Sequence, residues 1–295
     1  MLNFDENALK ALATEHATAQ LLVIEQGKTR FEQNFDPAPV DVFAVQKGLI
    51  ALLFGIASDV GLVDLDDPIN HHLTPAWTKL PPQDEASLTI RTLLTMTSGM
   101  SDDLGTLGVV GATWRYNNVA YNYLKKILTT QTALGLNQLT RQWLTGPLDM
   151  TDTQWIERNQ RLPDGTAFTG LLSTAKDLAR LGALVLAEGQ HDGSPLVPRW
   201  YCDHIAKPGS SENPAWGLCW WNNASAHFMM PMRDGVQEGQ IIPSAPPDLI
   251  ATRGAAENGL YVVPSLGVIV ARTARPGQNS IPGSFEQALW KCLCG

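Results

Sequence analysis

The stretch VDVFAVQKGLIALLFGIASD, residues 40–59, decides how this chain folds and where its chemistry should lie. It predicts a helix from about residue 44 to residue 60. Apolar residues lie on nearly all sides of that helix, so it should be buried rather than amphipathic. Lys47 stands near its start, in a run where nothing needs a charge. A lysine buried there would lose hydration, which lowers its pKa and makes the neutral amine accessible.

Composition indicates a soluble globular protein. The 295 residues are 44% hydrophobic and 17% charged, which suits one large domain or two joined ones. The formal net charge is −8 and the basic residues are scattered, which argues against a nucleic-acid partner. Acidic Asp5 and Glu6 stand where a signal peptide carries basic residues, and the longest apolar stretch, 49–57, is too short to span a membrane. We therefore expect a cytoplasmic protein with no membrane partner.

The cysteines and histidines form no recognisable metal or disulfide pattern. The four cysteines lack the spacing of a zinc site and the density of a disulfide scaffold, so we expect reduced thiols. His71 and His72 are adjacent and would face opposite ways on a regular element, which makes them a poor metal pair. The sequence thus implies no metal and no organic cofactor.

The order of predicted elements indicates a mixed α+β fold. A short helix at 7–16 precedes a hairpin with strands at 19–25 and 29–34. Strands return near the other end, in AWGLCWW, LIATRG, GLYVVP and GVIVARTA, before a last helix at 284–292. Between these ends the texture is helical, with Pro and Gly loops. Both chain ends should therefore form one antiparallel sheet flanked by helices, with a mainly helical domain inserted.

We place the domain boundaries from this change of texture. The sheet domain should comprise residues 1–60 and 165–295, and the helical domain residues 61–164. A cleft between them is the expected place for an active site. We leave a homodimer open.

The residue at position 44 decides whether Lys47 can belong to a catalytic motif. Positions three apart lie on the same face of a helix, so residues 44 and 47 can touch. In an S-x-x-K enzyme the serine attacks an acyl carbon and the lysine assists by taking its proton. Here the motif reads A-V-Q-K, and the methyl group of Ala44 cannot attack anything. Alone, a helical lysine would more simply snorkel to solvent.

Further along the chain, Tyr116-Asn117-Asn118 forms a Y-x-N triplet just before a predicted helix. A tyrosine there can relay a proton to a leaving group, and an asparagine amide can hold the substrate and the lysine together. The structural alternatives are a core tyrosine at 116 and a helix N-cap at Asn118, and Asn118 could serve both purposes.

These motifs resemble those of the class C β-lactamase-like serine hydrolases, a group that includes penicillin-binding DD-peptidases, β-lactamase-fold esterases and 6-aminohexanoate-dimer hydrolases. The resemblance implies a mixed α/β domain, a helical domain and a site between them. It also implies that Ala44 occupies the nucleophile position, Lys47 that of the general base, and Tyr116 and Asn118 the second motif. The segments that carry it, in order, are FAVQKGLIALLFGIASDVGLVDLDDPI, LTIRTLLTMTSGM, WRYNNVAYNYL, GLLSTAKDLARLGALVL, AWGLCWW and GLYVVPSLGVIVAR.

The third motif of that family is degenerate here. Members carry K-T-G or H-x-G on the strand beside the site, whereas this chain has Thr252-Arg253-Gly254. Gly254 allows close approach of a backbone to substrate. Arg253 could bind a substrate carboxylate, or strand alternation could point it away. From the family alone, N–H groups at residue 44 and at Ala255 or Ala256 are candidates for an oxyanion hole. The missing lysine or histidine favours an esterase or amide hydrolase over a β-lactamase.

Tryptophans cluster at Trp200, Trp216, Trp220 and Trp221. Core packing explains most such clusters, but an aromatic wall is the alternative, and we select Trp221 as a candidate substrate contact. An apolar, tryptophan-lined cleft would favour small acyl or aromatic esters and amides over peptidoglycan.

An intact S-x-x-K occurs at Ser173-Thr174-Ala175-Lys176, and we reject it as the active site. Ser173 stands where a helix N-cap belongs, with Thr174 as the alternative cap, and Lys176 would lie in an exposed first turn. Nothing there would remove the lysine from water.

The sequence therefore predicts a serine hydrolase acting on a small ester or amide through an acyl-enzyme, with its nucleophile replaced. Ala44 is either an engineered substitution or the mark of a natural pseudoenzyme that kept its pocket. Retention of Lys47, Tyr116 and Asn118 favours the first, because none has an obvious structural duty without catalysis. The alternatives are a DD-peptidase or β-lactamase proper, and a non-catalytic ligand-binding protein.

Overall fold

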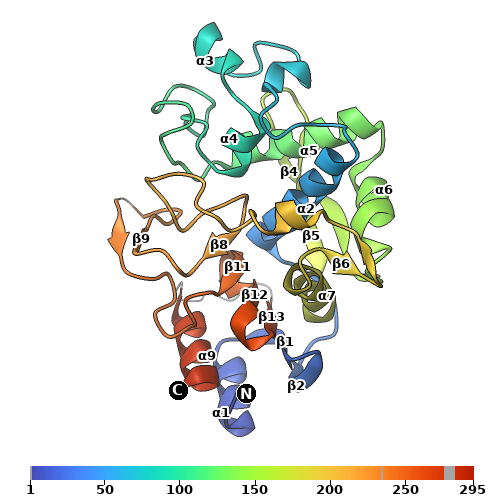
Figure 1. Cartoon of the computed structure of the whole chain (residues 1–295), viewed down its shortest axis with the longest axis vertical. Coiled ribbons are helices and arrows are strands. Elements are labelled where there is room, and N and C mark those ends of the chain that lie inside the picture. The colour runs from blue at the N-terminus through green and yellow to red at the C-terminus, as the bar shows by residue number, and fades with distance from the viewer. Residues whose placement is uncertain (1, 234, 276–282) are drawn as a thin grey trace.

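A six-stranded antiparallel sheet built from both chain ends forms one end of the molecule, as expected (Figure 1). The computed structural model describes residues 2–233, 235–275 and 283–295. The hairpin predicted at the N-terminus pairs directly with the last strand of the chain, so the two termini lie close together. In spatial order the strands are β2 (Lys28–Asn34), β1 (Thr18–Glu25), β13 (Val268–Ala274), β12 (Gly259–Val263), β11 (Ile250–Arg253) and β8 (Trp221–Asn222).

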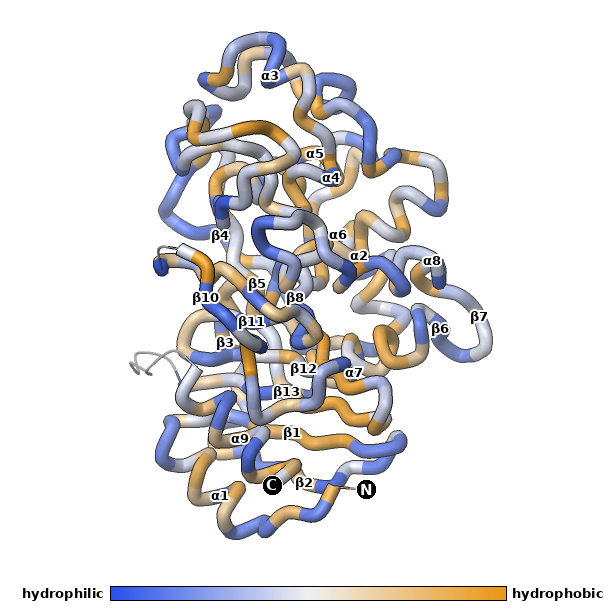
Figure 2. Tube along the Cα trace, turned by 60° about the vertical axis from the view of Figure 1, so that its left-hand side comes forward, coloured by the Kyte–Doolittle hydropathy of each residue, from blue (hydrophilic) through white to orange (hydrophobic). Residues whose placement is uncertain are grey.

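Helices cover both faces of this sheet, and strand alternation decides which side chains they meet. Leu260 and Val262 on β12 pack against Gly182 of α7 (Ala175–Leu186). Tyr261, between them, faces the other way and contacts Trp290 of α9 (Ser284–Cys294). Helix α1 (Glu6–Glu15) packs on α9 and β1. Figure 2 shows the run of hydrophobic residues along β1 that this arrangement buries.

Helix α2 (Gln46–Asp59) is the buried helix that the opening stretch predicts. It starts two residues later than expected, because Phe43–Val45 forms a separate turn of 3₁₀ helix. Every residue from 46 to 57 is buried, Lys47 included. Gly48 is required here, since a Cβ atom at this position would lie 2.1 Å from Thr252 Cγ2. The helix thus packs directly against β11, with no room for a larger residue.

The middle segment is mainly helical, but it ends in a strand. Strand β4 (Gln154–Arg161) pairs with β5 (Ala167–Ser173), which in turn pairs with β3 (Val40–Asp41) in a three-stranded sheet. This pairing crosses the boundary that we placed at residue 164, and the domain limits stay a prediction. The helices of the segment are α3 (Pro82–Ala86), α4 (Ile90–Leu94), α5 (Asn118–Thr132) and α6 (Leu136–Thr140), followed by a π-helical turn at Arg141–Thr145.

AWGLCWW is mostly a tight turn rather than the strand that we expected. The Gly217 N–H donates to Trp220 O, and Cys219 has a left-handed φ of 59° while its N–H donates to Leu94 O. Only Trp221 of this segment belongs to a strand.

The remaining short elements are β6 (Gln190–His191), β7 (Ser194–Pro195), α8 (Arg199–Cys202), β9 (His227–Phe228) and β10 (Gln237–Glu238). None of the described helices is long and apolar enough to cross a membrane.

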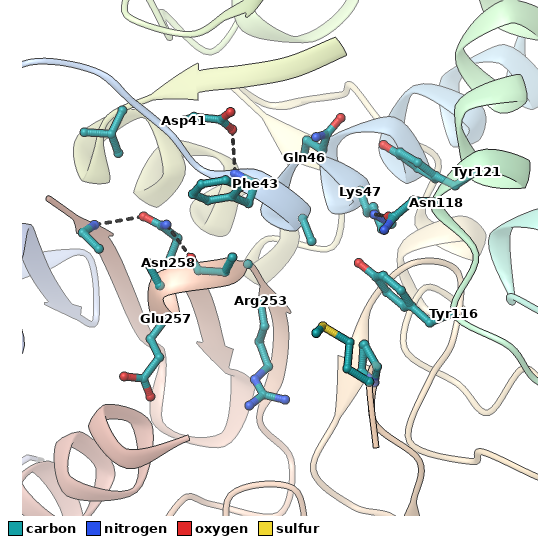
Figure 3. Close-up of a pocket in the computed structure, with 18 of the residues that line it drawn as sticks. Asp41, Phe43, Gln46, Lys47, Tyr116, Asn118, Tyr121, Arg253, Glu257 and Asn258 are labelled. Atoms are coloured by element: carbon teal, nitrogen blue, oxygen red, sulfur yellow. Dashed lines mark hydrogen bonds between the residues drawn. The ribbon is translucent and has the colours of Figure 1, made fainter. Parts of the chain in front are cut away.

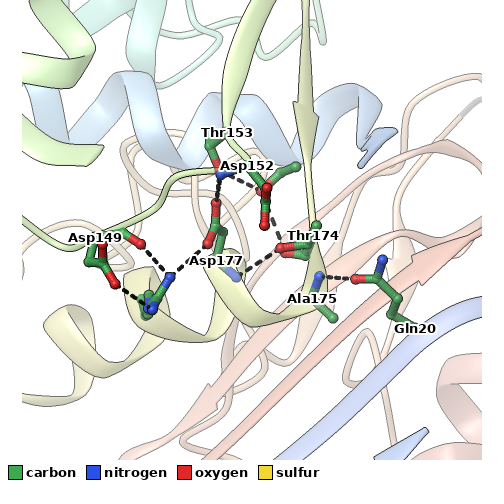
Figure 4. A network of polar contacts seen from close by, with 9 residues as sticks. Gln20, Asp149, Asp152, Thr153, Thr174, Ala175 and Asp177 are labelled. Atoms are coloured by element: carbon green, nitrogen blue, oxygen red, sulfur yellow. Dashed lines mark hydrogen bonds and ion pairs between the residues drawn. The ribbon is translucent and has the colours of Figure 1, made fainter. Parts of the chain in front are cut away.

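The N-terminus of α7 shows why Ser173-x-x-Lys176 is not a catalytic motif. Ser173 is the last residue of β5, and its hydroxyl contacts Thr153 Oγ1 at 2.8 Å. The cap is Thr174, whose side chain accepts a hydrogen bond from the Asp177 N–H at 3.2 Å (Figure 4). Of the two cap positions that we considered, the structure therefore selects Thr174 over Ser173. Lys176 is exposed, as expected.

Replacing Thr174 by alanine should lower the free energy of unfolding by about 1 kcal/mol, because one amide of the first turn of α7 loses its acceptor. Chemical denaturation monitored by circular dichroism measures the change. Lys176→Ala, in the same turn but exposed, should stay within about 0.5 kcal/mol of the unmodified chain. Equal losses for both variants would contradict the capping assignment.

Candidate active site

The start of α2, the start of α5 and the end of β11 meet around one cavity of about 780 Å³. Figure 3 shows side chains from these three elements converging on it. All eight residues selected from the sequence line this cavity: Ala44, Lys47, Tyr116, Asn118, Trp221, Arg253, Gly254 and Ala255. The structure therefore brings together residues that are far apart along the chain.

Lys47 is buried at the floor of this cavity, with 3% of its surface exposed. Its Nζ donates a hydrogen bond of 2.7 Å to Asn118 Oδ1 and lies 4.3 Å from the centre of the Tyr121 ring. The pKa of Lys47 is lowered to about 7, chiefly by burial, with smaller opposing effects of Cys219, which raises it, and of Arg158, which lowers it. A large share of this amine is therefore neutral at neutral pH.

Two adjacent asparagines have different roles at the start of α5. Asn117 is the N-cap, because its side chain accepts a hydrogen bond from the Ala120 N–H at 2.9 Å. Asn118 is the first helical residue, and its Oδ1 is left to accept from Lys47. This corrects the capping role that we considered for Asn118. Sequence alone offered two neighbouring asparagines and no means of choosing between them.

Tyr116 is half-buried and serves as a neutral phenol. Its ring packs edge-on against Trp216, with the ring centres 5.7 Å apart, and lies 4.7 Å from Lys47 Nζ. Burial raises the pKa of Tyr116 well above its ordinary value of 10. Figure 3 shows its hydroxyl pointing into the cavity, where it can donate a proton.

The backbone around residue 44 is tightly constrained. Phe43, just before it, has a left-handed φ of 51°, which is uncommon for a bulky side chain. A Cβ atom on Gly254 would lie 2.3 Å from Val42 O and 3.1 Å from the nitrogen of Ala44, so only glycine fits. Within the described residues, the N–H groups of Ala44 and Ala255 donate no hydrogen bond. They are free to bind an oxygen in the cavity.

Arg253 is held by a partner that sequence reasoning missed. Its Nε donates to Glu286 Oε1 at 2.7 Å, and a second bond joins Nη2 to Oε2. The Tyr261 hydroxyl also donates to Glu286 Oε1 at 2.7 Å. Glu286 thus takes the place in which we expected a substrate carboxylate. No signal in the sequence pointed to Glu286, because it lies on a helix 33 residues further along.

The clustered tryptophans mostly pack in the core, which is the alternative that we favoured, and Trp221 is the tryptophan that lines the cavity. Trp221 lines the cavity and packs against Trp216, with ring centres 4.6 Å apart. Trp114, which we did not select, contacts both. Trp200 lies elsewhere, 45% exposed, and Trp220 is in the core, where its Nε1 donates to Gly48 O.

The described residues contain no group of three or more side chains placed to hold a metal ion. The four cysteines are free thiols in the structure. Besides Glu286, sequence reasoning missed several residues around the cavity, among them Asp41, Gln46, Tyr121, Asn122 and Arg158.

Comparison with known proteins is consistent with this geometry. The β-lactamase family model matches residues 6–200, and the chain belongs to that family, whose members are serine hydrolases. A relative of uncharacterised function from Alkalihalophilus pseudofirmus is 25% identical over 260 residues, covering 78% of this chain and 72% of the relative.

Two solved structures illustrate the shared fold. EstCE1, a hydrolase with promiscuous acyltransferase activity, superposes with a TM-score of 0.72 at 13% identity, covering 98% of both chains. A class C β-lactamase of Rhodobacter sphaeroides superposes with a TM-score of 0.69 at 16% identity, covering 97% of both. At these identities the likeness establishes the fold alone.

Replacing Lys47 by methionine should raise the free energy of unfolding by about 2 kcal/mol at pH 7, because a costly buried amine is removed. The gain should shrink toward pH 10. Between the pKa near 7 of the folded chain and 10.5 of the unfolded chain, the unfolded state binds more protons, so the stability of the unmodified chain rises with pH. Urea denaturation at several pH values measures both effects. A gain that is independent of pH would count against the lowered pKa.

Arg253→Met should cost about 3 kcal/mol of stability, since the buried carboxylate of Glu286 loses its counter-charge. The double variant Arg253→Met/Glu286→Leu should recover most of that loss, because no unpaired charge remains. Denaturation of the single and double variants provides the comparison. A single variant as stable as the unmodified chain would remove the structural role assigned to this pair.

Proposed function

We propose that the cavity binds a small ester or amide, and that a serine at position 44 would make it the site of an acyl-enzyme hydrolase. The supporting observation is the buried amine of Lys47, bonded to Asn118 and placed one helical turn from residue 44. With Ala44 the chain lacks the attacking oxygen, so it should bind such compounds but scarcely turn them over.

The roles of the other groups follow from where charge would develop. A serine hydroxyl at 44 would attack the acyl carbon while the neutral amine of Lys47 takes its proton. The unpaired N–H groups of Ala44 and Ala255 would stabilise the oxyanion. Tyr116, protonated and directed into the cavity, would give a proton to the leaving group. Water would then hydrolyse the acyl-enzyme by the same path.

Several features favour a small ester or amide over a β-lactam. Arg253 is occupied by Glu286, so the strand beside the site presents no free cation for a carboxylate. Trp221, Phe43 and Met230 give the cavity apolar walls. The fold shared with EstCE1 is compatible with this substrate class. The expected location in the cytoplasm remains part of the proposal.

Ala44 itself favours a second candidate function, that of a ligand-binding pseudoenzyme. The cavity, Lys47 and Tyr116 are all in place without a nucleophile, and binding needs nothing more. We favour an engineered replacement of serine, because keeping a lysine buried is costly without a use for its amine. The codon for residue 44 in the native gene distinguishes the two origins.

Ala44→Ser should produce turnover of p-nitrophenyl esters and a mass increase equal to one acyl group on residue 44. The rate should rise with pH through about 7, where Lys47 loses its proton. Assays with an ester panel, an amide panel and nitrocefin, followed by intact mass spectrometry, measure these effects.

Two matched variants control this experiment. Ala44→Ser/Lys47→Met should stay inert, whereas Ala44→Ser/Ser173→Ala should match Ala44→Ser, because Ser173 lies on β5 away from the cavity. If Ala44→Ser remains inert and unacylated across the whole panel, the hydrolase proposal fails and the ligand-binding function takes its place.

A further inference from the structure

A second buried lysine lies beside the first. Lys125 on α5 is 5% exposed and was not selected from the sequence. Its Nζ lies 2.5 Å from Gln46 Oε1 and 3.1 Å from Asn122 Oδ1. The same Nζ atom lies 3.1 Å from the backbone oxygen of Thr169 and 2.8 Å from Thr169 Oγ1. The amine is therefore surrounded by oxygen atoms from α2, α5 and β5.

The number of acceptors decides which lysine keeps its proton. Three of the four oxygens around Lys125 can only accept hydrogen bonds, which matches the three N–H groups of an ammonium ion. The orientation of the Asn122 amide is determined by its own Nδ2, which donates to Asn118 O at 2.7 Å. A neutral amine has only two N–H groups, so it would leave one of these three acceptors unpaired even if the Thr169 hydroxyl donated to its lone pair. Lys47, in contrast, has the single acceptor Asn118 Oδ1.

Burial lowers the pKa of Lys125 as well, but three acceptor oxygens stabilise its protonated form, and it forms no ion pair among the described residues. The two amines lie 4.3 Å and 5.1 Å from the centre of the same Tyr121 ring, so they are within about 10 Å of each other. The positive charge of Arg158 is paired with Asp41. A protonated Lys125 therefore disfavours a second proton on Lys47.

The other titratable groups that face Lys47 are neutral. Burial raises the pKa of Tyr116 and of Tyr121 above the ordinary value of 10. Burial likewise raises the pKa of the Cys219 thiol to about 12. None of these three carries a negative charge near pH 7 that could hold the proton on Lys47.

We propose that Lys125 keeps Lys47 unprotonated, and that Lys47 is consequently a nucleophilic amine which condenses with small apolar aldehydes in this cavity. A desolvated lysine beside another cation is a known route to such reactivity. The reaction needs no serine and is independent of the hydrolysis proposed above.

The condensation uses groups already in place. The lone pair of Lys47 Nζ forms a bond to the carbonyl carbon as the C=O π bond breaks, and one of the two N–H protons passes from nitrogen to the oxygen to give a carbinolamine. Tyr116 then protonates the hydroxyl group, which leaves as water while nitrogen forms the C=N bond. The proton released from nitrogen returns to the Tyr116 oxygen, so the enzyme ends as it began apart from the imine. Phe43, Trp221 and Met230 favour an apolar aldehyde.

Reductive trapping of the unmodified chain tests the proposal. Benzaldehyde and sodium cyanoborohydride convert an imine into a stable benzylamine, and peptide mass spectrometry locates it. At pH 7 Lys47 should react at least about tenfold faster than exposed Lys176, because far more of its amine is neutral. The midpoint of its rate against pH should lie near 7. A Lys47 that reacts no faster than Lys176 would overturn the proposal, whatever Ala44→Ser does with esters.

Variants at position 125 test the positioning role. Lys125→Met should lower the trapping rate of Lys47 at pH 7 about tenfold and raise its midpoint by about one pH unit, because the neighbouring charge is gone. Lys125→Arg should restore the midpoint, since the charge returns. Lys126→Met, at the adjacent position but paired with Asp164 at the surface, should change nothing. Lys125→Gln replaces the methionine variant if the latter fails to fold. An unchanged midpoint in either variant would overturn the role of Lys125.

Discussion

The burial of a lysine amine at the head of α2 is the constraint on which the active-site region depends. Lys47 can be kept from water only because α2 is covered on all sides, and Gly48 lets β11 lie directly against it. Its one hydrogen-bond acceptor, Asn118, comes from α5, in the helical part of the molecule. This buried group therefore links α2, which packs on the sheet, to α5 across the cavity.

The other charges around the cavity are also paired. The buried Arg253 and Glu286 bind each other, with Tyr261 donating to Glu286, and the partly buried Arg158 is paired with Asp41. Buried charges without such partners are strongly disfavoured. The two lysines have no carboxylate, so amide and carbonyl oxygens replace it. These charges are already paired or hydrogen-bonded, which favours uncharged esters, amides and aldehydes over ions as ligands.

The main-chain features of the site are present although residue 44 is alanine and carries no nucleophile. The strained backbone at Phe43, the contact of Gly254 with Val42 and the unpaired N–H groups are all present without a nucleophilic side chain. These features belong to the main chain, so one substitution at Cβ does not disturb them. The chain can therefore retain a preorganised site whether it descends from an active hydrolase or has been altered into an inert one.

The sequence by itself determined the buried helix, the sheet shared by both chain ends and the positions of Lys47, Tyr116 and Asn118, because apolar periodicity and motif spacing are local properties. The sequence could not decide between Asn117 and Asn118 as N-cap, nor between Ser173 and Thr174. In each case the cap is the residue just before the backbone adopts helical φ and ψ angles, and a shift of one residue changes it. The pairing of Arg253 with Glu286 and the place of Lys125 beside Lys47 were decided only by the tertiary structure. Those contacts join residues distant along the chain, and nothing local to either partner records them.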